Sequence, residues 1–268
     1  MPELPEVETV RRTLEPILKD KTIVDVAVYH QNMVETPDFI EQLKNQTIKS
    51  IDRMGKFLIF KLNDKVMISH LRMEGKYFLT DPRKKHPHEH VVFYLDNGQT
   101  LIYHDVRKFG KFQIRSYENY RKVSPLLKLG PEPKEANPQV IYKQLKKRHI
   151  TIKQALLDQH VMAGLGNIYV DETLFRAQLH PQKNTSTLTK KQVESLVKHA
   201  IDVLNHAIEL GGSTIRSYYA TIGVDGKFQN ELKVHTKKDE PCPVCQTQII
   251  KIKVGGRGTY VCPRCQKK

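Results

Sequence analysis

The sequence predicts an α+β protein of several domains: an N-terminal β-sandwich flanked by helices, a helical domain, and a C-terminal β-hairpin that carries four cysteines. Three observations support this prediction. Short β-prone runs fill residues 22–115, helical patterns follow from residue 140, and all four cysteines lie within residues 242–265. At 268 residues the chain is long enough for two modest domains, or for one domain with an appendage.

The first predicted element is a helix that begins near Pro5. Apolar residues recur after it at helical spacing, at Val7, Val10, Leu14 and Leu18. A proline near the first helical position and acidic residues in the first turn are start signals. We therefore expect residues 2–3 to lie just before the positive end of this helix.

The β-domain is predicted from runs of β-branched and aromatic residues. These runs are residues 23–28, 57–60, 66–68, 91–95 and 100–103. Asn97-Gly98 lies between the last two runs, and Asn-Gly in that position is a strong hairpin signal. We interpret the region as a β-sandwich or barrel-like domain capped by the first helix.

Proline and glycine mark the end of the β-domain. Residues 130–138 are rich in both, so we place one boundary after residue 131 and a second after residue 230. Four helical patterns lie between these boundaries, and Gly211-Gly212 is expected to end the last of them. The patterns cover Val140 to Lys147, Ile152 to Asp158, Asn167 to Ala177 and Lys190 to Glu209.

The charge balance favours a polyanionic partner. The formal net charge is +15 and the pI is about 9.5, and nucleic acid is the commonest partner for such a chain. The sequence has no apolar run long enough to span a bilayer and no signal peptide pattern. Clustered cysteines and an acidic N-terminus favour a reducing cytoplasm.

The four cysteines form two Cys-x2-Cys pairs, Cys242/Cys245 and Cys262/Cys265, with sixteen residues between the pairs. Four thiolates at this spacing are typical of a closed tetrahedral zinc site, so we expect one structural Zn²⁺. Disulfides are the less favoured alternative. Residues 249–254 and 259–261 alternate as strands, with the turn at residues 255–258. Arg257 would then stand at the hairpin tip, either as a phosphate contact or as a solvated surface residue.

The N-terminus carries a second chemical signal. Removal of Met1 is expected before the small residue Pro2 and would expose a secondary amine, with Glu3 and Glu6 nearby. Amines form Schiff bases with carbonyl-like carbons, and carboxyl groups can move protons. The alternative is that Pro-x-x-Pro-Glu simply starts a helix.

Gly164 and Gly166 precede the predicted helix that starts at Asn167. A helix N-terminus with outward backbone N–H groups can bind a phosphate. Taken alone, the pattern fits a plain connection between helices better.

Five motifs, in order, resemble those of the bacterial formamidopyrimidine-DNA glycosylase family, which repairs 8-oxoguanine. They are Pro2 to Val10, Ser69 to Gly75, Asp105 to Gly110, Gly164 to Glu172, and the four-cysteine hairpin. The resemblance runs from end to end of the chain. It implies a catalytic β-sandwich domain at residues 1–131, a helix-two-turn-helix DNA-binding domain at 132–230 and a zinc finger at 231–268.

The resemblance also implies a role for each matching residue. The catalytic residues would be the nucleophile Pro2, the acid/base Glu3, and Lys56 near the lesion and its phosphate. The other roles divide into three groups: a lesion pocket of Glu6, Ser217 and Thr221; phosphate clamps at His70, Asn167 and Arg257; and Met73, Arg107 and Phe109, which would fill the gap left by an extruded nucleotide.

The implied activity is base-excision repair by a bifunctional glycosylase and apurinic/apyrimidinic lyase. Its partner would be double-stranded DNA that contains oxidised bases or abasic sites. The resemblance implies no organic cofactor, no membrane association and action as a monomer. It places the protein in the bacterial cytoplasm, associated with the nucleoid during repair.

Two alternatives and one departure remain. An endonuclease VIII-type glycosylase for oxidised pyrimidines shares the fold, but its opening usually reads Pro-Glu-Gly-Pro where this chain has Leu4. A non-catalytic zinc-finger DNA-binding protein would have no reason to carry Pro2, Glu3 and Glu6 together. The family usually has Tyr-Gly, with the tyrosine near a phosphate, where this chain has His235-Thr236.

Overall fold

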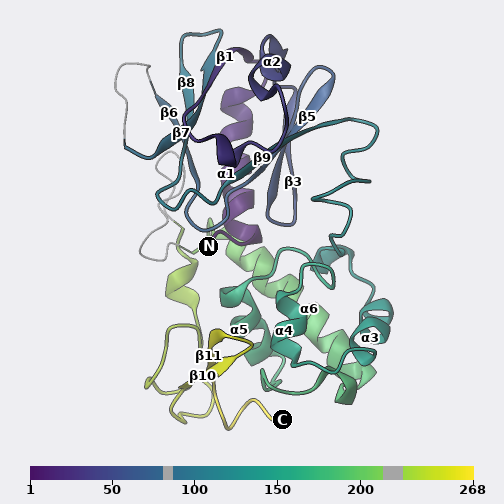
Figure 1. Ribbon diagram of the computed structural model, residues 1–268. Coiled ribbons are helices and arrows are strands. Elements are labelled where there is room, and N and C mark those ends of the chain that lie inside the picture. Colours follow the sequence, from purple (N-terminus) through teal and green to yellow (C-terminus); the bar gives the residue numbers. More distant parts are fainter. Residues whose placement is uncertain (81–86, 214–225) are drawn as a thin grey trace. The chain divides into compact units, whose positions relative to one another are not determined.

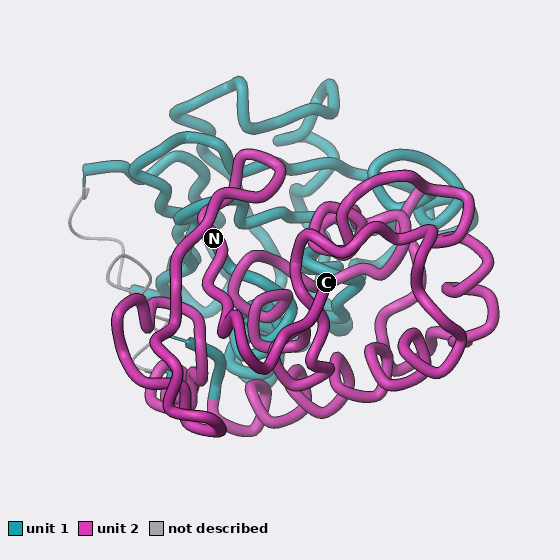
Figure 2. Tube along the Cα trace, turned by 90° about the horizontal axis from the view of Figure 1, so that it is seen from below, with its two compact units in different colours: residues 1–127, 211–226 teal, residues 128–210, 227–268 magenta. Residues whose placement is uncertain are grey.

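The computed structural model describes residues 1–80, 87–213 and 226–268. They form two compact units, each discontinuous in sequence (Figure 2). Unit 1 comprises residues 1–127 and 211–226, and unit 2 comprises residues 128–210 and 227–268. No helix within the described ranges is long and apolar enough to cross a membrane.

Unit 1 contains two antiparallel sheets, which confirms the predicted β-sandwich (Figure 1). The first sheet has the order β2-β1-β7-β8-β6, and the second has the order β3-β4-β5-β9. The five strands of the first are β1 (Thr22–Val28), β2 (Gln46–Thr47), β6 (Lys76–Thr80), β7 (Glu89–Leu95) and β8 (Thr100–His104). The four strands of the second are β3 (Ser50–Met54), β4 (Phe57–Lys61), β5 (Lys65–His70) and β9 (Lys111–Ser116).

Helix α1 (Leu4–Leu18) belongs to the core of unit 1. The side chains of Val7, Val10, Leu14 and Leu18 are at most 1 % exposed and pack with apolar side chains from both sheets. The short helices η1 (Gln31–Met33) and α2 (Phe39–Leu43) complete the unit, and Phe39 joins the same core. Burial of this apolar face is what fixes α1 in place.

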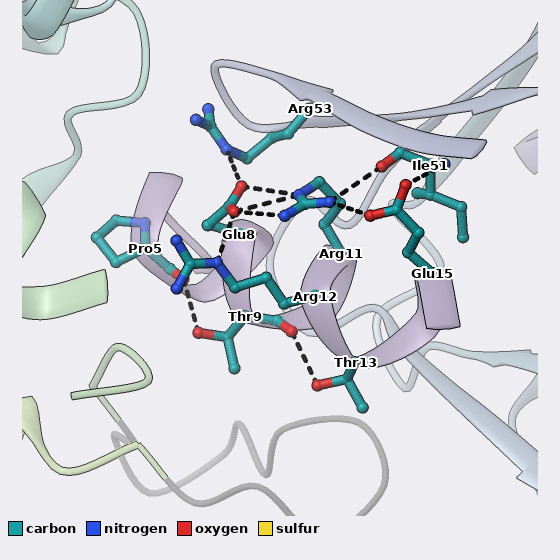
Figure 3. A network of polar contacts seen from close by, with 9 residues as sticks. All are labelled: Pro5, Glu8, Thr9, Arg11, Arg12, Thr13, Glu15, Ile51 and Arg53. Carbon is teal, nitrogen blue, oxygen red and sulfur yellow. Dashed lines mark hydrogen bonds and ion pairs between the residues drawn. The ribbon is translucent and has the colours of Figure 1, made fainter. Parts of the chain in front are cut away.

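A buried carboxylate ties α1 to strand β3 (Figure 3). Glu8 accepts hydrogen bonds from Nε of Arg11 at 3.1 Å, of Arg12 at 2.8 Å and of Arg53 at 3.0 Å. Burial opposes ionisation of Glu8, but the hydrogen bonds from Arg11 and Arg12 outweigh it and lower the pKa of this carboxyl group. Arg53 comes from β3, so the contact fixes the helix against that strand.

Unit 2 is helical and ends in a hairpin. Its helices are α3 (Pro138–Lys146), α4 (Ile152–Leu157), α5 (Asn167–Arg176) and α6 (Lys190–Glu209), with 3₁₀ turns at Pro133–Glu135, Thr185–Thr187 and Phe228–Glu231. The four predicted helices are confirmed. Helix α3 starts two residues earlier than predicted because the side chain of Asn137 caps the backbone N–H groups of Gln139 and Val140.

The residues at the two ends of α6 explain why its predicted bounds match the structure. Thr189 forms a capping box with Gln192 at the start. Gly211 and Gly212 follow the helix with φ of 75° and 79°, a left-handed conformation that glycine adopts without strain.

The C-terminal hairpin consists of β10 (Ile250–Val254) and β11 (Arg257–Val261). The four-residue turn predicted at residues 255–258 is wrong. Arg257 pairs with Val254 as the first residue of β11, and the turn is Gly255-Gly256 alone. Both glycines have positive φ, 54° and 79°, as a two-residue hairpin turn requires.

Candidate functional site

The N-terminal residues form a buried group of carboxylates at the start of α1. Pro2 is buried, Glu3 is 2 % exposed and Glu6 is 4 % exposed. Glu3 is the N-cap residue, and its backbone N–H donates to Glu6 Oε2 at 2.8 Å in a capping box. The fold therefore places Pro2 directly before the positive end of the helix, with two carboxylates held close by.

Glu6 also accepts hydrogen bonds from Ser213, a residue far away in the sequence. Its Oε1 accepts hydrogen bonds from the backbone N–H of Ser213 at 2.8 Å and from the Ser213 hydroxyl at 3.3 Å. A Cβ atom at Gly212 would lie 2.7 Å from the same oxygen, so this approach requires a glycine. Ser217 and Thr221, predicted for the lesion pocket, lie outside the described residues.

Lys56 and His70 come from neighbouring strand ends in unit 1. Lys56 is 5 % exposed in the turn between β3 and β4, and His70 is 8 % exposed at the end of β5. The ring of Phe57, which pairs with His70 in the sheet, lies edge-on to the imidazole with centroids 4.5 Å apart. The two predicted residues thus lie close together.

His70 is held as a neutral hydrogen-bond donor. Its Nδ1 accepts the backbone N–H of Arg72 at 2.8 Å, so in the neutral ring Nε2 carries the hydrogen. Burial, and then the positive charges of Arg72 and Lys56, lower the pKa of His70 to about 3. At neutral pH the ring can donate to an anion without carrying a charge itself.

The 105–110 loop presents Arg107 and Phe109 outward. Arg107 is exposed, the Phe109 side chain is 49 % exposed, and the Arg107 guanidinium carbon lies 5.0 Å from the centre of the Phe109 ring. The buried carboxylate of Asp105 accepts backbone N–H groups from Arg107 at 3.0 Å, and from Phe109 and Gly110 at 2.9 Å each. Asp105 thus holds the loop that carries Arg107 and Phe109, two of the three residues predicted to fill the gap.

Tyr103 anchors this loop and the Met73 loop together. A Cβ atom at Gly75 would lie 2.0 Å from the Tyr103 hydroxyl oxygen, and one at Gly110 would lie 1.9 Å from it. The backbones of both loops therefore pack against the same buried hydroxyl. Met73, two residues before Gly75, is half-buried.

In unit 2 the predicted phosphate contacts lie on α5 and β11. Asn167 is the first residue of α5, and its Nδ2 donates to the carbonyl oxygen of Gly258 at 3.1 Å. Its Oδ1 is buried and has no hydrogen-bond partner among the described residues. Arg257 is exposed next to Gly258. The structure therefore brings Asn167 and the Arg257 segment together.

A buried ionic cluster that the sequence reasoning missed supports this arrangement. Nζ of Lys153 lies 2.6 Å from Asp171 Oδ1 and donates to Gly258 O at 3.3 Å. Asp171 Oδ2 lies 2.8 Å from Nδ1 of His235 and accepts the backbone N–H of Tyr260 at 3.3 Å. The cluster joins α4, α5, β11 and residue 235 at their contact points.

Glu172, the neighbour of Asp171, binds the chain that leads to the hairpin. Its carboxylate accepts the backbone N–H groups of Lys233, Val234 and His235 at 2.9–3.1 Å. Burial raises the pKa of Glu172, and these hydrogen bonds oppose that rise. Two adjacent acids in an otherwise mostly apolar helix were the available sequence signal, because buried charges are rare unless they are paired.

The four cysteines fit a tetrahedral zinc ion. Their sulfur atoms all lie within 4.8 Å of one another, with Sγ–Sγ distances of 3.8 Å for Cys242/Cys265 and 3.4 Å for Cys245/Cys262. Zinc–thiolate bonds of about 2.3 Å in a tetrahedron imply sulfur separations of about 3.8 Å. Four thiolates leave no open position, so the bound Zn²⁺ would be structural and would hold the hairpin closed.

These features define a class of protein: a two-sheet unit whose N-terminal helix starts beside a buried proline, and a helical unit closed by a four-cysteine hairpin. Family models agree along the chain. Residues 1–112 match the formamidopyrimidine-DNA glycosylase N-terminal domain, residues 129–219 match the H2TH domain of the same enzymes, and residues 239–268 match the zinc finger found in FPG and IleRS. The chain belongs to the formamidopyrimidine-DNA glycosylase family.

Relatives and solved structures support the same assignment. The chain is 50 % identical to the formamidopyrimidine-DNA glycosylase of Oceanobacillus iheyensis, over 99 % of this chain and 98 % of that one. It is 49 % identical to that of Streptococcus mutans, over the full length of both. It is also similar to a mutant of the Lactococcus lactis FPG in complex with DNA that contains Fapy-dG (TM-score 0.95, 43 % identity, 100 % of both chains). A complex of the Lactococcus lactis Fpg with abasic-site DNA gives a TM-score of 0.94 at 43 % identity, covering 99 % of this chain and 100 % of that one. The protein is therefore a DNA glycosylase of base-excision repair.

Proposed function

We propose that this chain, after removal of Met1, excises oxidised purines from duplex DNA through the secondary amine of Pro2. The observation that carries the proposal is the setting of that proline. It is buried directly before α1, with Glu3 and Glu6 held around the positive end of the helix. A positive helix end disfavours a protonated amine. The neutral amine is the nucleophilic form.

The reaction begins at the anomeric carbon of the damaged nucleotide. The Pro2 nitrogen bonds to this carbon as the bond between the carbon and the base breaks, and the amine proton passes to the departing base. Glu3 then delivers a proton to the ring oxygen, so the sugar opens to an iminium. The iminium acidifies the neighbouring carbon. Loss of a proton from that carbon expels the 3′ phosphate by β-elimination. A second elimination then expels the 5′ phosphate. Water finally hydrolyses the iminium and releases Pro2. The proposed substrates are 8-oxoguanine and formamidopyrimidines.

We assign extrusion of the nucleotide to the Met73 loop and the 105–110 loop, which both pack against Tyr103. An enzyme that cleaves a glycosidic bond must take the nucleotide out of the stack, at a cost of a few kcal/mol. Apolar wedges offset part of that cost, and an arginine can hydrogen-bond the base left behind. Met73, Arg107 and Phe109 take these roles. The stacking of Arg107 on the half-exposed Phe109 ring supports this assignment.

The remaining site residues bind the phosphates and the base. Lys56 and the neutral donor His70 are proposed phosphate contacts from unit 1, and Asn167 and Arg257 are proposed contacts from unit 2. Lys56 also lies near the lesion in this proposal. Glu6, Ser217 and Thr221 form the proposed pocket for the extruded base. Arginine and helix N-termini are well suited to phosphate oxygens.

The proposal extends to the organisation of the protein. Residues 1–131 form the catalytic domain, and residues 132–230 form the DNA-binding domain with the lesion loop. Residues 231–268 form a zinc finger that binds one Zn²⁺. The protein acts as a monomer in the cytoplasm and associates with the nucleoid during repair. The net charge of +15 supports binding to the DNA backbone.

Borohydride trapping tests the proposal directly, because borohydride reduces an iminium to a stable amine cross-link. The purified protein is mixed with a duplex that carries 8-oxoguanine opposite cytosine, and separately with one that carries oxidised thymine. We expect a cross-link at Pro2 that forms faster with 8-oxoguanine. Mass spectrometry of the free protein checks that Met1 is absent.

The Pro2→Gly variant is the matched control, and we expect it to bind duplex DNA with greatly reduced excision. Full activity in this variant would remove Pro2 from the mechanism. A preference for oxidised thymine would indicate an endonuclease VIII-type specificity. Tight binding without any cross-link would favour a non-catalytic DNA-binding protein.

A further inference from the structure

The backbone carbonyl oxygen of Asp105 is bound from two sides. It accepts the backbone N–H of Lys108 at 3.3 Å, which closes a four-residue turn over residues 105–108. It also lies 2.9 Å from Nε2 of His90, a residue of β7 that is 6 % exposed. A carbonyl oxygen has two lone pairs, so these two donors use both of them.

This contact fixes the tautomer of His90. A carbonyl oxygen only accepts hydrogen bonds, so Nε2 of His90 carries the hydrogen. Burial lowers the pKa of His90, and the hydrogen bond to Asp105 opposes that shift without reversing it, so the ring is neutral at neutral pH. A neutral imidazole has one N–H group. The ring therefore donates its one hydrogen to the Asp105 carbonyl.

The backbone of His90 is itself held in the first sheet of unit 1. Strand β7 lies between β1 and β8, and the His90 carbonyl accepts the backbone N–H of Tyr29 at 2.8 Å. The carbonyl of His88, also next to β8, accepts the backbone N–H of Asp105 at 3.0 Å. The imidazole of His90 is thus a short link between a strand inside the sheet and the 105–108 turn.

Arg107 is the third residue of this turn, and its side chain is exposed. The Asp105 carboxylate binds the backbone N–H groups of Arg107 and of Phe109 beyond the turn. His90 instead binds the peptide unit between residues 105 and 106, directly after β8 ends at His104. Rotation of that peptide unit would redirect the chain that carries Arg107, and the hydrogen bond from His90 opposes such a rotation.

We propose that His90 is a positioning residue for extrusion of the damaged nucleotide, because it holds the 105–108 turn in the orientation that brings Arg107 and Phe109 to the duplex. The inference rests on the proposed function, in which this loop fills the gap. His90 does not touch the reacting atoms, so it acts on extrusion and not on the later bond-breaking steps. Extrusion costs least where no base pair must be broken, so His90 should matter less at a preformed abasic site.

The first test compares two variants on two duplexes in single-turnover reactions. His90→Leu fills the site without a donor, whereas His90→Gln is the matched control, since its amide can donate to the same carbonyl. On a duplex with 8-oxoguanine opposite cytosine, we expect excision by His90→Leu to be about two- to tenfold slower than by the wild type, the range that one net hydrogen bond gives. Cleavage at a preformed abasic site should slow much less. His90→Gln should keep most of the wild-type rate on both duplexes.

Fluorescence reports the extrusion step separately from the chemistry. A 2-aminopurine placed beside the lesion becomes brighter when its stacking is lost. In stopped-flow mixing we expect this rise to be slower in His90→Leu than in the wild type and in His90→Gln.

The outcomes separate this inference from the proposed function. Equal losses by His90→Leu on both duplexes would show a general structural role and would overturn the inference. An unchanged excision rate in His90→Leu, or a His90→Gln variant as slow as His90→Leu, would do the same. Each of these results leaves the proposed function intact when the wild type excises 8-oxoguanine. A wild-type protein that is inactive on both duplexes would overturn both.

A second measurement needs no variant. Two-bond ¹H–¹⁵N correlation spectra of the wild-type protein distinguish the tautomers of neutral histidines. We expect hydrogen on Nε2 of His90. His70, whose Nδ1 accepts from Arg72, serves as an internal reference of the same tautomer. Hydrogen on Nδ1 of neutral His90 would leave no donor for the Asp105 carbonyl and would contradict the proposal.

Discussion

The buried carboxylate of Asp105 accepts a hydrogen bond of 2.9 Å from the backbone N–H of Phe109, a residue whose own side chain is 49 % exposed. The buried Asp105 thus fixes the backbone of Phe109 and keeps its apolar ring on the surface. The same carboxylate binds the N–H groups of Arg107 and Gly110. The shape of this loop therefore depends on a residue that does not itself point outward.

Asp105→Ala should loosen this loop. Three backbone donors would lose a charged acceptor, and hydrogen bonds to charged groups contribute about 1.5–3 kcal/mol each, so a loss of a few kcal/mol in the free energy of unfolding is expected. Affinity for lesion duplex should fall as well. Thermal unfolding and a binding titration measure both effects. Asp96→Ala, at an exposed hairpin turn, is the control and should change neither.

Gly110→Ala should destabilise unit 1 more than Gly98→Ala. An added Cβ at Gly110 would lie 1.9 Å from the buried Tyr103 hydroxyl, whereas nothing lies within 4 Å of a Cβ at Gly98. Gly98 has φ of +81°, so its substitution costs about 1–2 kcal/mol of backbone strain alone. Chemical denaturation of the two variants checks the order. Equal losses would mean that Tyr103 moves aside freely.

Lys153→Met should be strongly destabilising, by about 3–5 kcal/mol, because it leaves the buried charge of Asp171 without its ammonium partner. The double variant Lys153→Met, Asp171→Leu removes both charges and should recover part of this loss. A double-mutant cycle on unfolding free energies measures the coupling. Additive losses would show that the pair does not interact.

His70 makes stability depend on pH. Its pKa is about 3 in the folded protein against an ordinary value of 6.5, so between these values the unfolded chain binds more protons. The stabilising contribution is complete above pH 6.5 and is lost as pH falls toward 3, by up to about 1.4 kcal/mol per pH unit. Unfolding free energies from pH 7 to 5 should fall less steeply in His70→Gln.

Cys245→Ser should open the hairpin. Loss of one of four thiolates weakens zinc binding, and zinc binding supplies folding energy to modules of this size. We expect reduced zinc by metal analysis and loss of DNA binding, with chelation of the wild-type protein giving the same result. Normal DNA binding by a zinc-free protein would contradict this expectation.

Local signals explain what the sequence could predict. The Thr189 cap and the Gly211-Gly212 stop both act within a few residues of α6, and its predicted bounds match the structure. Alternation in residues 249–254 and 259–261 likewise predicted the hairpin, and cysteine spacing predicted the zinc site. Strands β3 and β9 were not predicted, because polar residues such as Asp52 and Gln113 interrupt their apolar character.

Long-range contacts explain most of what could not be predicted from the sequence. Asp171 meets its partners Lys153 and His235 only in the folded chain, 18 and 64 residues away. Arg257 was expected in the turn, but the two glycines before it suffice for a hairpin connection, so Arg257 enters the strand. Contacts such as those of Asp171 depend on packing, which residue spacing does not encode.

The discontinuity of both units has a consequence for synthesis on the ribosome. Unit 1 closes with residues 211–226 and unit 2 with residues 227–268, so neither is complete until most of the chain has been made. Until Ser213 emerges, Glu6 lacks two of its hydrogen bonds. Every strand of the two sheets in unit 1 is made before residues 211–226 of that unit, and no single cut in the chain can release either unit whole.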